Sequence, residues 1–240
     1  MKTAFLFPGQ GSQALGMLSE SADAVAGTFE EASEALGYDL WSLIQQGPVE
    51  QLNQTEFTQP ALLTVSVALW RLWAEAGGRA DFVAGHSLGE YSALVASNVL
   101  SLSDGVRVVQ KRGQLMQAAV PLGAGGMAAV MGLEDDKILA ACRQATADAQ
   151  SGSVQPANLN APGQVVISGT QAALDRAIEL CQDAGAKRAI ALNVSAPFHS
   201  ELMRPAADAL RETLAQVTFS NPTIDIIQNV LAEPCRDIEG

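Results

Sequence analysis

The chain has 240 residues, which is enough to bury a full core and predicts one large domain or a domain with an insert. Its 48% apolar residues, 17% charged residues and 21 glycines are typical of a compact α/β protein. The 14 basic and 26 acidic residues give a net charge of -12, which argues against a nucleic acid or an anionic membrane as partner. An acidic protein partner would need a local basic patch.

The sequence contains no pattern of a signal peptide or a membrane span. The N-terminal apolar run stops at Pro8, and the longest apolar run elsewhere is interrupted by Arg71. The three cysteines, Cys142, Cys181 and Cys235, are an odd number without the spacing of a metal site. We therefore expect reduced thiols, no bound metal and a cytoplasmic protein.

The first predicted element is a buried strand at residues 3–7, which leads into a glycine-rich loop. Residues 9–14 of this loop satisfy the G-x-G-x-x-A pattern of a dinucleotide-binding turn. That pattern also requires an acidic residue at the end of a second strand about twenty residues later. The acidic residues found there, Glu30 and Glu31, lie in a stretch with helical spacing that ends at Gly37. Nucleotide binding is therefore the less favoured interpretation of the loop.

A helix is predicted at residues 58–76, because Thr58-Gln59-Pro60 is typical of a helix start and the apolar periodicity continues to Gly77. Gln59 is then either a residue of the functional site or a cap, and a polar residue at a helix start is more often a cap.

Residues 82–97 contain the motif around which we expect the chain to be organised. A β-type run is followed by Gly85-His86-Ser87-Leu88-Gly89 and then by a helix-forming run. This is G-x-S-x-G at a strand-to-helix turn, which places Ser87 at a strained corner with its hydroxyl exposed. The helix directs its first N–H groups and its positive dipole end to that hydroxyl, so an oxyanion beside Ser87 would meet the Leu88 amide. The simpler alternative is a glycine-rich turn that contains a serine by chance.

A further helix is predicted at residues 103–119, with a polar and an apolar arc when it is drawn at 100° per residue. The polar arc holds Arg107, Gln110, Lys111, Gln114 and Gln117, and the apolar arc holds Val106, Val108, Val109, Leu115 and Met116. Arg112 lies in the middle of the apolar arc. Because a buried cation without a partner is costly, Arg112 should face either an internal carboxylate or a cavity that binds a ligand's carboxylate. The helical pattern leaves both open.

From residue 124 to residue 192 the pattern changes to the order β-α-β-β-α-β. The strands are predicted at residues 127–131, 154–159, 164–168 and 187–192, and the helices at residues 135–149 and 170–184. This is the order of the ferredoxin-like fold. We therefore predict an α/β chain with a large domain at residues 1–123 and 193–240 and an inserted ferredoxin-like domain at residues 124–192. A last strand is predicted at residues 224–230.

The chain has two histidines, and one of them is a plausible base for Ser87. His86 adjoins the serine in the turn, where neighbouring side chains diverge. His199, directly after Phe198, is left to activate the serine. A histidine near a proline is usually a surface or capping residue, so this assignment depends on the turn at Ser87. No acidic residue fills the triad position between serine and histidine in an obvious way, so a backbone carbonyl or a later side chain would orient His199.

Six segments follow one another along nearly the whole chain. They are Phe-Pro-Gly-Gln-Gly-Ser-Gln at residues 7–13, Thr-Gln-Pro-Ala at 58–61, Gly-His-Ser-Leu-Gly-Glu at 85–90, Gln-Lys-Arg-Gly at 110–113, Asn-Ala-Pro-Gly-Gln-Val-Val-Ile-Ser-Gly at 160–169 and Ala-Pro-Phe-His-Ser at 196–200. With these segments the sequence resembles the malonyl-coenzyme A:acyl carrier protein transacylases of fatty acid synthesis.

The resemblance implies an α/β-hydrolase-like large domain with a ferredoxin-like insert, in agreement with the pattern above. It also implies ping-pong transfer of a malonyl group from malonyl-CoA to the phosphopantetheine thiol of acyl carrier protein, without cofactor or metal. Ser87 would be acylated, His199 would act as base and then as acid, and Arg112 would hold the malonyl carboxylate.

By the same resemblance, Gln10 and Leu88 would supply the amides of the oxyanion hole. Phe198 matches the form of its motif that is associated with malonyl preference. Members of the family continue for about seventy residues beyond the position that matches Gly240, so the chain resembles a version that lacks the C-terminal segment.

Two other functions share parts of this pattern. A serine thioesterase or esterase would use Ser87 and His199 but has no need of a cation at position 112. A non-catalytic or weakly catalytic module that binds carrier protein is the second alternative, motivated by the missing C-terminal segment.

Overall fold

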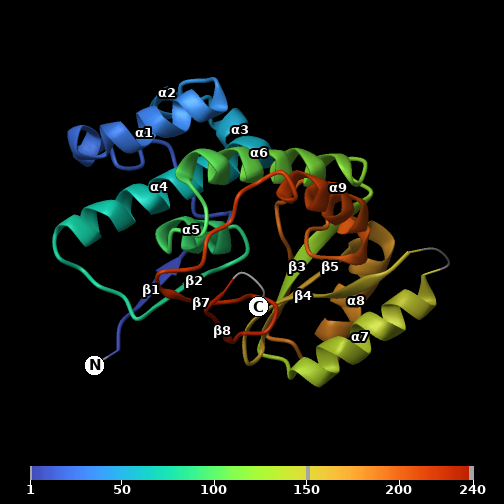
Figure 1. Cartoon of the computed structure of the whole chain (residues 1–240). Coiled ribbons are helices and arrows are strands. Elements are labelled where there is room, and N and C mark those ends of the chain that lie inside the picture. Colours follow the sequence, from blue (N-terminus) through green and yellow to red (C-terminus); the bar gives the residue numbers. More distant parts are fainter. Residues whose placement is uncertain (1, 150–151, 238–240) are drawn as a thin grey trace. The chain divides into compact units, whose positions relative to one another are not determined.

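The computed structural model describes residues 2–149 and 152–237 (Figure 1). The chain divides into two compact units, of which unit 1 comprises residues 1–114 and 212–240 and unit 2 comprises residues 115–211. The insert predicted at residues 124–192 lies within unit 2, and its boundaries as a separate domain stay a prediction. The chain combines helices and sheets, as the predicted α/β class requires.

Unit 1 contains two groups of elements from the two ends of the chain. Its strands and helices are β1 (Ala4–Phe7), η1 (Ser19–Ser21), α1 (Ala22–Leu36), α2 (Leu40–Gln46), α3 (Val49–Leu52), α4 (Thr55–Glu75), β2 (Phe82–Gly85), α5 (Gly89–Ala96), most of α6 (Leu102–Ala118), β7 (Asp225–Ile227) and β8 (Pro234–Cys235). The predicted strand at residues 3–7 and the predicted helix at residues 103–119 are confirmed to within one residue at each end.

The sheet of unit 1 has the strand order β1-β2-β7-β8. β1, β2 and β7 run parallel, with Phe7 paired to Gly85 and Ala84 paired to Ile227, whereas β8 is antiparallel to β7. Parallel strands direct their carboxyl ends to the same edge of a sheet. The segments that follow β1, β2 and β7 therefore begin side by side at one edge.

Helices cover this sheet from one side and provide the core of the unit. α5 packs on β1 and β2, and α4 packs beside α5 and α1 (Figure 1). On α6 the predicted apolar arc is confirmed, because Val106, Val108 and Val109 are buried while Arg107 is exposed.

Two predicted boundaries are wrong. The helix expected at residues 58–76 begins at Thr55, so Pro60 lies inside α4 and Gln59 is not its cap. Proline disfavours a helix interior, but here tertiary burial outweighs that preference, since Thr55 is only 1% exposed. The strand expected at residues 224–230 ends at Ile227, where the chain turns back to form β8.

Unit 2 is built from β3 (Gly125–Met131), α7 (Asp135–Asp148), β4 (Val154–Ala161), β5 (Gln164–Thr170), α8 (Gln171–Asp183), β6 (Arg188–Ala191), η2 (Glu201–Met203) and most of α9 (Arg204–Leu214). Its sheet is antiparallel with the order β4-β5-β3-β6, which is the ferredoxin-like arrangement that the element order predicted. α7 and α8 pack against each other and on the sheet, and the core between them contains Ile138, Cys142, Ile167 and Cys181.

Within the described residues, no helix combines the length and the apolar composition needed to cross a membrane. No group of three or more histidine, cysteine or acidic side chains in the described part of the chain is arranged to hold a metal ion.

The burial of two cysteines predicts their reactivity. Cys142 and Cys181 are buried, whereas Cys235 is partly exposed. Burial, with a smaller contribution from Cys181, raises the pKa of the Cys142 thiol to about 12, and burial also raises the pKa of Cys181. Because the thiolate is the reactive form, a disulfide reagent at pH 8 should quickly modify only the thiol of Cys235 in the native protein. In denaturant it should modify all three thiols quickly. The Cys235→Ser variant should lose the fast phase, and a fast phase from two or more thiols would contradict the packing of unit 2.

Candidate active site

The motif at residues 85–89 forms the predicted strand-to-helix turn. β2 ends at Gly85, α5 begins at Gly89, and Ser87 lies between them in the left-handed region with φ = 52°. That conformation costs a residue with a side chain about 1–2 kcal/mol, so the surrounding contacts must hold it in place. Ser87 is therefore the strained residue that the sequence pattern predicts.

Close approach of three backbone segments explains the glycines of this turn. A Cβ on Gly85 would overlap the carbonyl group of Gly89, and a Cβ on Gly89 would overlap the carbonyl oxygen of Phe7. A Cβ on Gly9 would lie 2.6 Å from the carbonyl oxygen of His86. The loop after β1 thus lies directly beside the turn after β2, and only glycine fits at these contacts.

The loop at residues 9–14 does not have the geometry of a nucleotide site. A helix should begin within the G-x-G-x-x-A pattern, but α1 begins at Ala22, and Glu30 and Glu31 lie inside α1 instead of at the end of a second strand. The nucleotide interpretation is therefore wrong.

Two backbone amides near the turn are available to a ligand. The amides of residues 89–91 bond to the carbonyl groups of residues 86–88. Neither the N–H of Leu88 nor the N–H of Gln10 has a hydrogen-bond acceptor among the described residues, 2–149 and 152–237. The side chain of Gln10 is fixed, because its Oε1 accepts a hydrogen bond of 2.6 Å from Thr55 Oγ1.

Arg112 reaches the nucleophile from α6. Its Nη1 donates to Gln59 Oε1 at 2.8 Å, and its Nη2 donates to Ser87 Oγ at 3.3 Å. Its Cζ lies 5.5 Å from the centre of the Tyr91 ring, within the range of a cation–π contact. The structure thus brings Ser87 and Arg112 together, and it adds Gln59 and Tyr91 to the site.

Arg112 has acidic and aromatic neighbours but no direct ion pair in the described residues. Within the described residues it forms no ion pair with a carboxylate. Burial lowers its pKa below the usual range, and nearby Tyr91 and Glu90 partly offset this. Of the two alternatives for Arg112, the internal ion pair is not found in the described residues, and the binding of a ligand's carboxylate stays a prediction.

A glycine also sets the approach of α6 to α4. A Cβ on Gly113 would lie 2.6 Å from the Cα of Glu56 and 2.7 Å from the carbonyl oxygen of Thr55. The two helices are in backbone contact at this point, one residue after Arg112. This contact allows the guanidinium of Arg112 to reach the fully buried Gln59 on α4.

The predicted base lies in unit 2, on the segment between β6 and η2. His199 has a left-handed backbone, with φ = 58°, and its side chain is exposed between the buried residues Phe198 and Ser200. Ser200 Oγ donates to the carbonyl oxygen of Pro197 at 2.7 Å, which closes the turn beneath the histidine. Phe198 is 6% exposed and packs among apolar residues that include Met127 and Met203, so its contact with a substrate stays a prediction.

Sequence reasoning only half recognised Gln59 and missed Thr55 and Tyr91. Thr55 and Gln59 are polar residues on a face of α4 that is otherwise apolar, and this pattern could have indicated them. The predicted helix start was wrong, so Gln59 was interpreted as a cap. Tyr91 lies in the first turn of α5, directly after the turn that carries Ser87, and this nearness in the chain could have indicated it.

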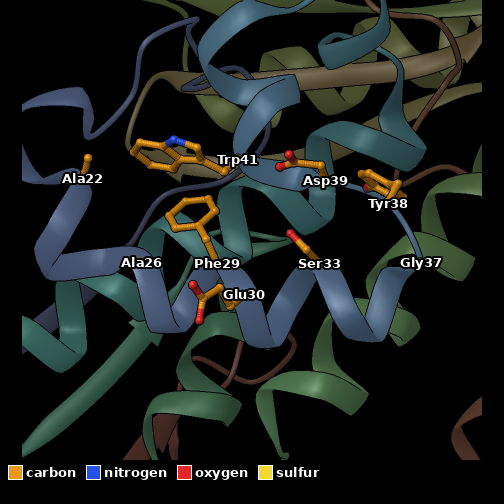
Figure 2. Close-up of a pocket in the computed structure, with 9 residues that line it drawn as sticks. All are labelled: Ala22, Ala26, Phe29, Glu30, Ser33, Gly37, Tyr38, Asp39 and Trp41. Carbon is orange, nitrogen blue, oxygen red and sulfur yellow. The ribbon is translucent and has the colours of Figure 1, made fainter.

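A separate hollow lies between α1 and α2 in unit 1 (Figure 2). Phe29, Tyr38 and Trp41 line it together with smaller and acidic residues. None of the residues around Ser87 lines this hollow, so we do not assign the chemistry to it.

Known proteins resemble this chain over most of its length. The family model of the acyl transferase domain matches residues 4–237. This chain belongs to the acyl transferase family.

Relatives of this acyl transferase include proteins with a named activity. The malonyl CoA-acyl carrier protein transacylase of Escherichia coli K12 is 56% identical over 95% of this chain and 74% of that protein. The protein of the same name from Bacillus subtilis is 49% identical over 97% of this chain and 74% of that protein.

Solved structures of malonyltransferases are also similar to this chain. An acyl carrier protein S-malonyltransferase from Vibrio cholerae is 55% identical, with a TM-score of 0.93 over 98% of this chain and 78% of that one. A malonyl-transacylase in complex with a type II polyketide acyl-carrier protein is 49% identical, with a TM-score of 0.95 over 100% of this chain and 78% of that one. These likenesses confirm the predicted fold class and do not favour a thioesterase or a non-catalytic module.

If the left-handed conformation strains Ser87, substitutions of this residue should change the stability of this acyl transferase in a characteristic order. Ser87→Gly and Ser87→Ala both remove the hydroxyl and its contact with Arg112, but only glycine relieves the backbone strain. Glycine also gains more entropy in the unfolded chain, which cancels part of this advantage. The free energy of unfolding should therefore be higher for Ser87→Gly than for Ser87→Ala by about 0.5–1 kcal/mol. Urea unfolding measures this difference.

The matched control is the same pair of substitutions at Ser66, which lies in the middle of α4. There the glycine variant should be the less stable one, because glycine is a poor helix former. Equal stability of the two Ser87 variants, or a more stable alanine variant, would show that the turn is not strained.

Proposed function

We propose that this acyl transferase moves the malonyl group of malonyl-CoA to the phosphopantetheine thiol of an acyl carrier protein, through a malonyl ester of Ser87. The observation that carries the proposal is the partly buried guanidinium of Arg112, which lies 3.3 Å from the Ser87 hydroxyl and has no carboxylate partner in the described residues. The names of the relatives support the same substrates.

The first half of the reaction acylates the enzyme. Ser87 Oγ attacks the thioester carbonyl carbon while His199 takes the hydroxyl proton. The tetrahedral intermediate then expels the thiolate of coenzyme A, which takes that proton from His199. The thioester bond is broken and the ester bond to Ser87 is formed.

The oxyanion of the tetrahedral intermediate binds to the amides of Leu88 and Gln10. The availability of both amides supports this role, as does the position of Leu88 at the amino end of α5, where the helix dipole favours negative charge. The bond between Gln10 and Thr55 holds the loop in place before the substrate arrives.

Arg112 selects the acyl group. Its planar guanidinium can form two parallel hydrogen bonds with the malonyl carboxylate, and Gln59 and Tyr91 hold the guanidinium in place. An acetyl group has no carboxylate and would leave the cation unpaired. The site therefore favours a dicarboxylic acyl group.

In the second half, the thiol of the carrier protein replaces coenzyme A. His199 takes the thiol proton as the sulfur attacks the malonyl ester, and Ser87 recovers a proton from His199 as it leaves. All of the proton transfers in this scheme use side chains of this chain. We also place the reaction in the cytoplasm, in keeping with three cysteines that form no disulfide.

The nucleophile and the base should act as one unit. Ser87→Ala and His199→Ala should each lower malonyl transfer by about a thousandfold or more, and the double variant should be little slower than either single one. Intact mass after mixing with malonyl-CoA should show one malonyl group on the unaltered protein and none on Ser87→Ala. His86→Ala is the matched control, and a loss of activity there with full activity in His199→Ala would show that the wrong histidine was chosen.

Removal of the cation should change the acyl preference. Arg112→Ala should cost malonyl transfer about 2–5 kcal/mol in transition-state stabilisation, whereas acetyl transfer should change little or improve. The measurement is kcat/KM for both thioesters, with Arg107→Ala on the exposed face of α6 as the control. An equal loss for both acyl groups would assign Arg112 a structural role instead.

A further inference from the structure

Asn229 makes the turn at Ser87 part of the sheet. The chain leaves β7 after Ile227, whose partner on β2 is Ala84, so the backbone pairing stops one residue before Gly85. Asn229 follows two residues later and belongs to unit 1, as Ser87 does.

The side-chain amide of Asn229 continues the pairing. Its Nδ2 donates to the carbonyl oxygen of Gly85 at 2.7 Å, and its Oδ1 accepts from the N–H of Ser87 at 2.9 Å. In a parallel ladder, a residue opposite His86 would bond to these same two groups through its own peptide N–H and C=O. A primary amide carries the same donor and acceptor as a peptide unit, and here it replaces one.

A third contact fixes Asn229 itself. Its backbone N–H donates to Glu90 Oε1 at 3.2 Å, in the first turn of α5. Asn229 therefore holds the end of β2, the residue at the strained corner and the start of the following helix.

We propose that Asn229 is a positioning residue for the nucleophile, which holds Ser87 in its left-handed conformation and thereby aligns the Ser87 hydroxyl and the Leu88 amide for acyl transfer. It acts through the backbone of the turn and does not touch the reacting atoms. The test by malonyl transfer rests on the proposed function. The tests by a serine-reactive probe and by hydrogen exchange rest on the geometry of the turn alone.

The main test compares Asn229→Ala and Asn229→Asp with the unaltered protein. Alanine removes both bonds, whereas aspartate keeps the shape and the acceptor but turns a second acceptor toward the Gly85 carbonyl. Both variants should lower the single-turnover rate of Ser87 acylation at saturating malonyl-CoA by about 10- to 100-fold, since small misplacements of a nucleophile cost this much. The half-saturating concentration should change by less than about twofold, because Arg112 keeps its contacts with Gln59 and Tyr91.

The matched control is Thr223→Val, in the same segment of the chain. Thr223 also makes one side-chain donor bond, to the carbonyl oxygen of Ser97 at 3.0 Å, and accepts one, from Asn98 Nδ2 at 3.2 Å. It tethers the segment to the far end of α5, away from Ser87. Thr223→Val should lower the thermal midpoint while the acylation rate stays within about threefold of the unaltered protein.

A second readout does not depend on malonyl chemistry. A fluorophosphonate probe reacts with an activated serine, and its rate with Ser87 should fall in both Asn229 variants by a factor similar to that for acylation. If the unaltered protein is not acylated by malonyl-CoA, the proposed function fails, and the fluorophosphonate rates still test Asn229.

The unaltered protein offers a test that needs no variant to fold. The Ser87 amide should exchange its hydrogen slowly in NMR-detected exchange, because it is bonded to Asn229 Oδ1. Exchange at the rate of an exposed amide would overturn the inference. So would an Asn229→Asp variant with a normal acylation rate, or a Thr223→Val variant that is slowed as much as Asn229→Ala.

Discussion

The parallel pairing of β1, β2 and β7 is the constraint on which the arrangement around Ser87 depends. Because all three strands end at one edge of the sheet, segments near residues 10, 87 and 229 converge there, although they are far apart along the chain. Each contributes a different group: the loop after β1 an amide, the turn after β2 a hydroxyl, and the segment after β7 a side-chain amide. The close backbone approach of these segments explains the glycines at positions 9, 85 and 89.

A partly buried cation beside the Ser87 hydroxyl is the second physical feature of the site. Gln59 and Tyr91 contact the Arg112 guanidinium but carry no carboxylate that could pair with it. Burial disfavours the charged form of this guanidinium, and an anion bound beside it would reduce that cost. The guanidinium also donates a hydrogen bond to the Ser87 hydroxyl, so the cation and the proposed nucleophile are direct neighbours.

Two residues with side chains, Ser87 and His199, carry left-handed backbones at the positions proposed for the chemistry. Each is held by neighbours that do no chemistry: the bonds of Asn229 hold the first, and the bond from Ser200 to Pro197 closes the turn that carries the second. Strain at a reacting group persists only when the surrounding structure specifies it more strongly than the local preference opposes it. The surrounding hydrogen bonds are therefore as much a part of the site as the reacting groups.

The sequence by itself determined the features that depend on local chemistry. The G-x-S-x-G pattern predicted the turn and its strained serine, the helical period placed Arg112 on an apolar face, and the element order predicted the ferredoxin-like sheet of unit 2. Local patterns failed at Pro60 and at residues 228–230, where tertiary burial extends a helix through a proline and the chain turns back although its residues favour a strand. Only the tertiary structure decided that Gln59 meets Arg112 and that Asn229 meets Ser87, across 53 and 142 residues. Such contacts have no periodicity along the chain, because they arise from the packing of elements that are distant in sequence. A polar residue that bonds to a distant partner therefore has the same local sequence pattern as one that caps a helix or forms a turn.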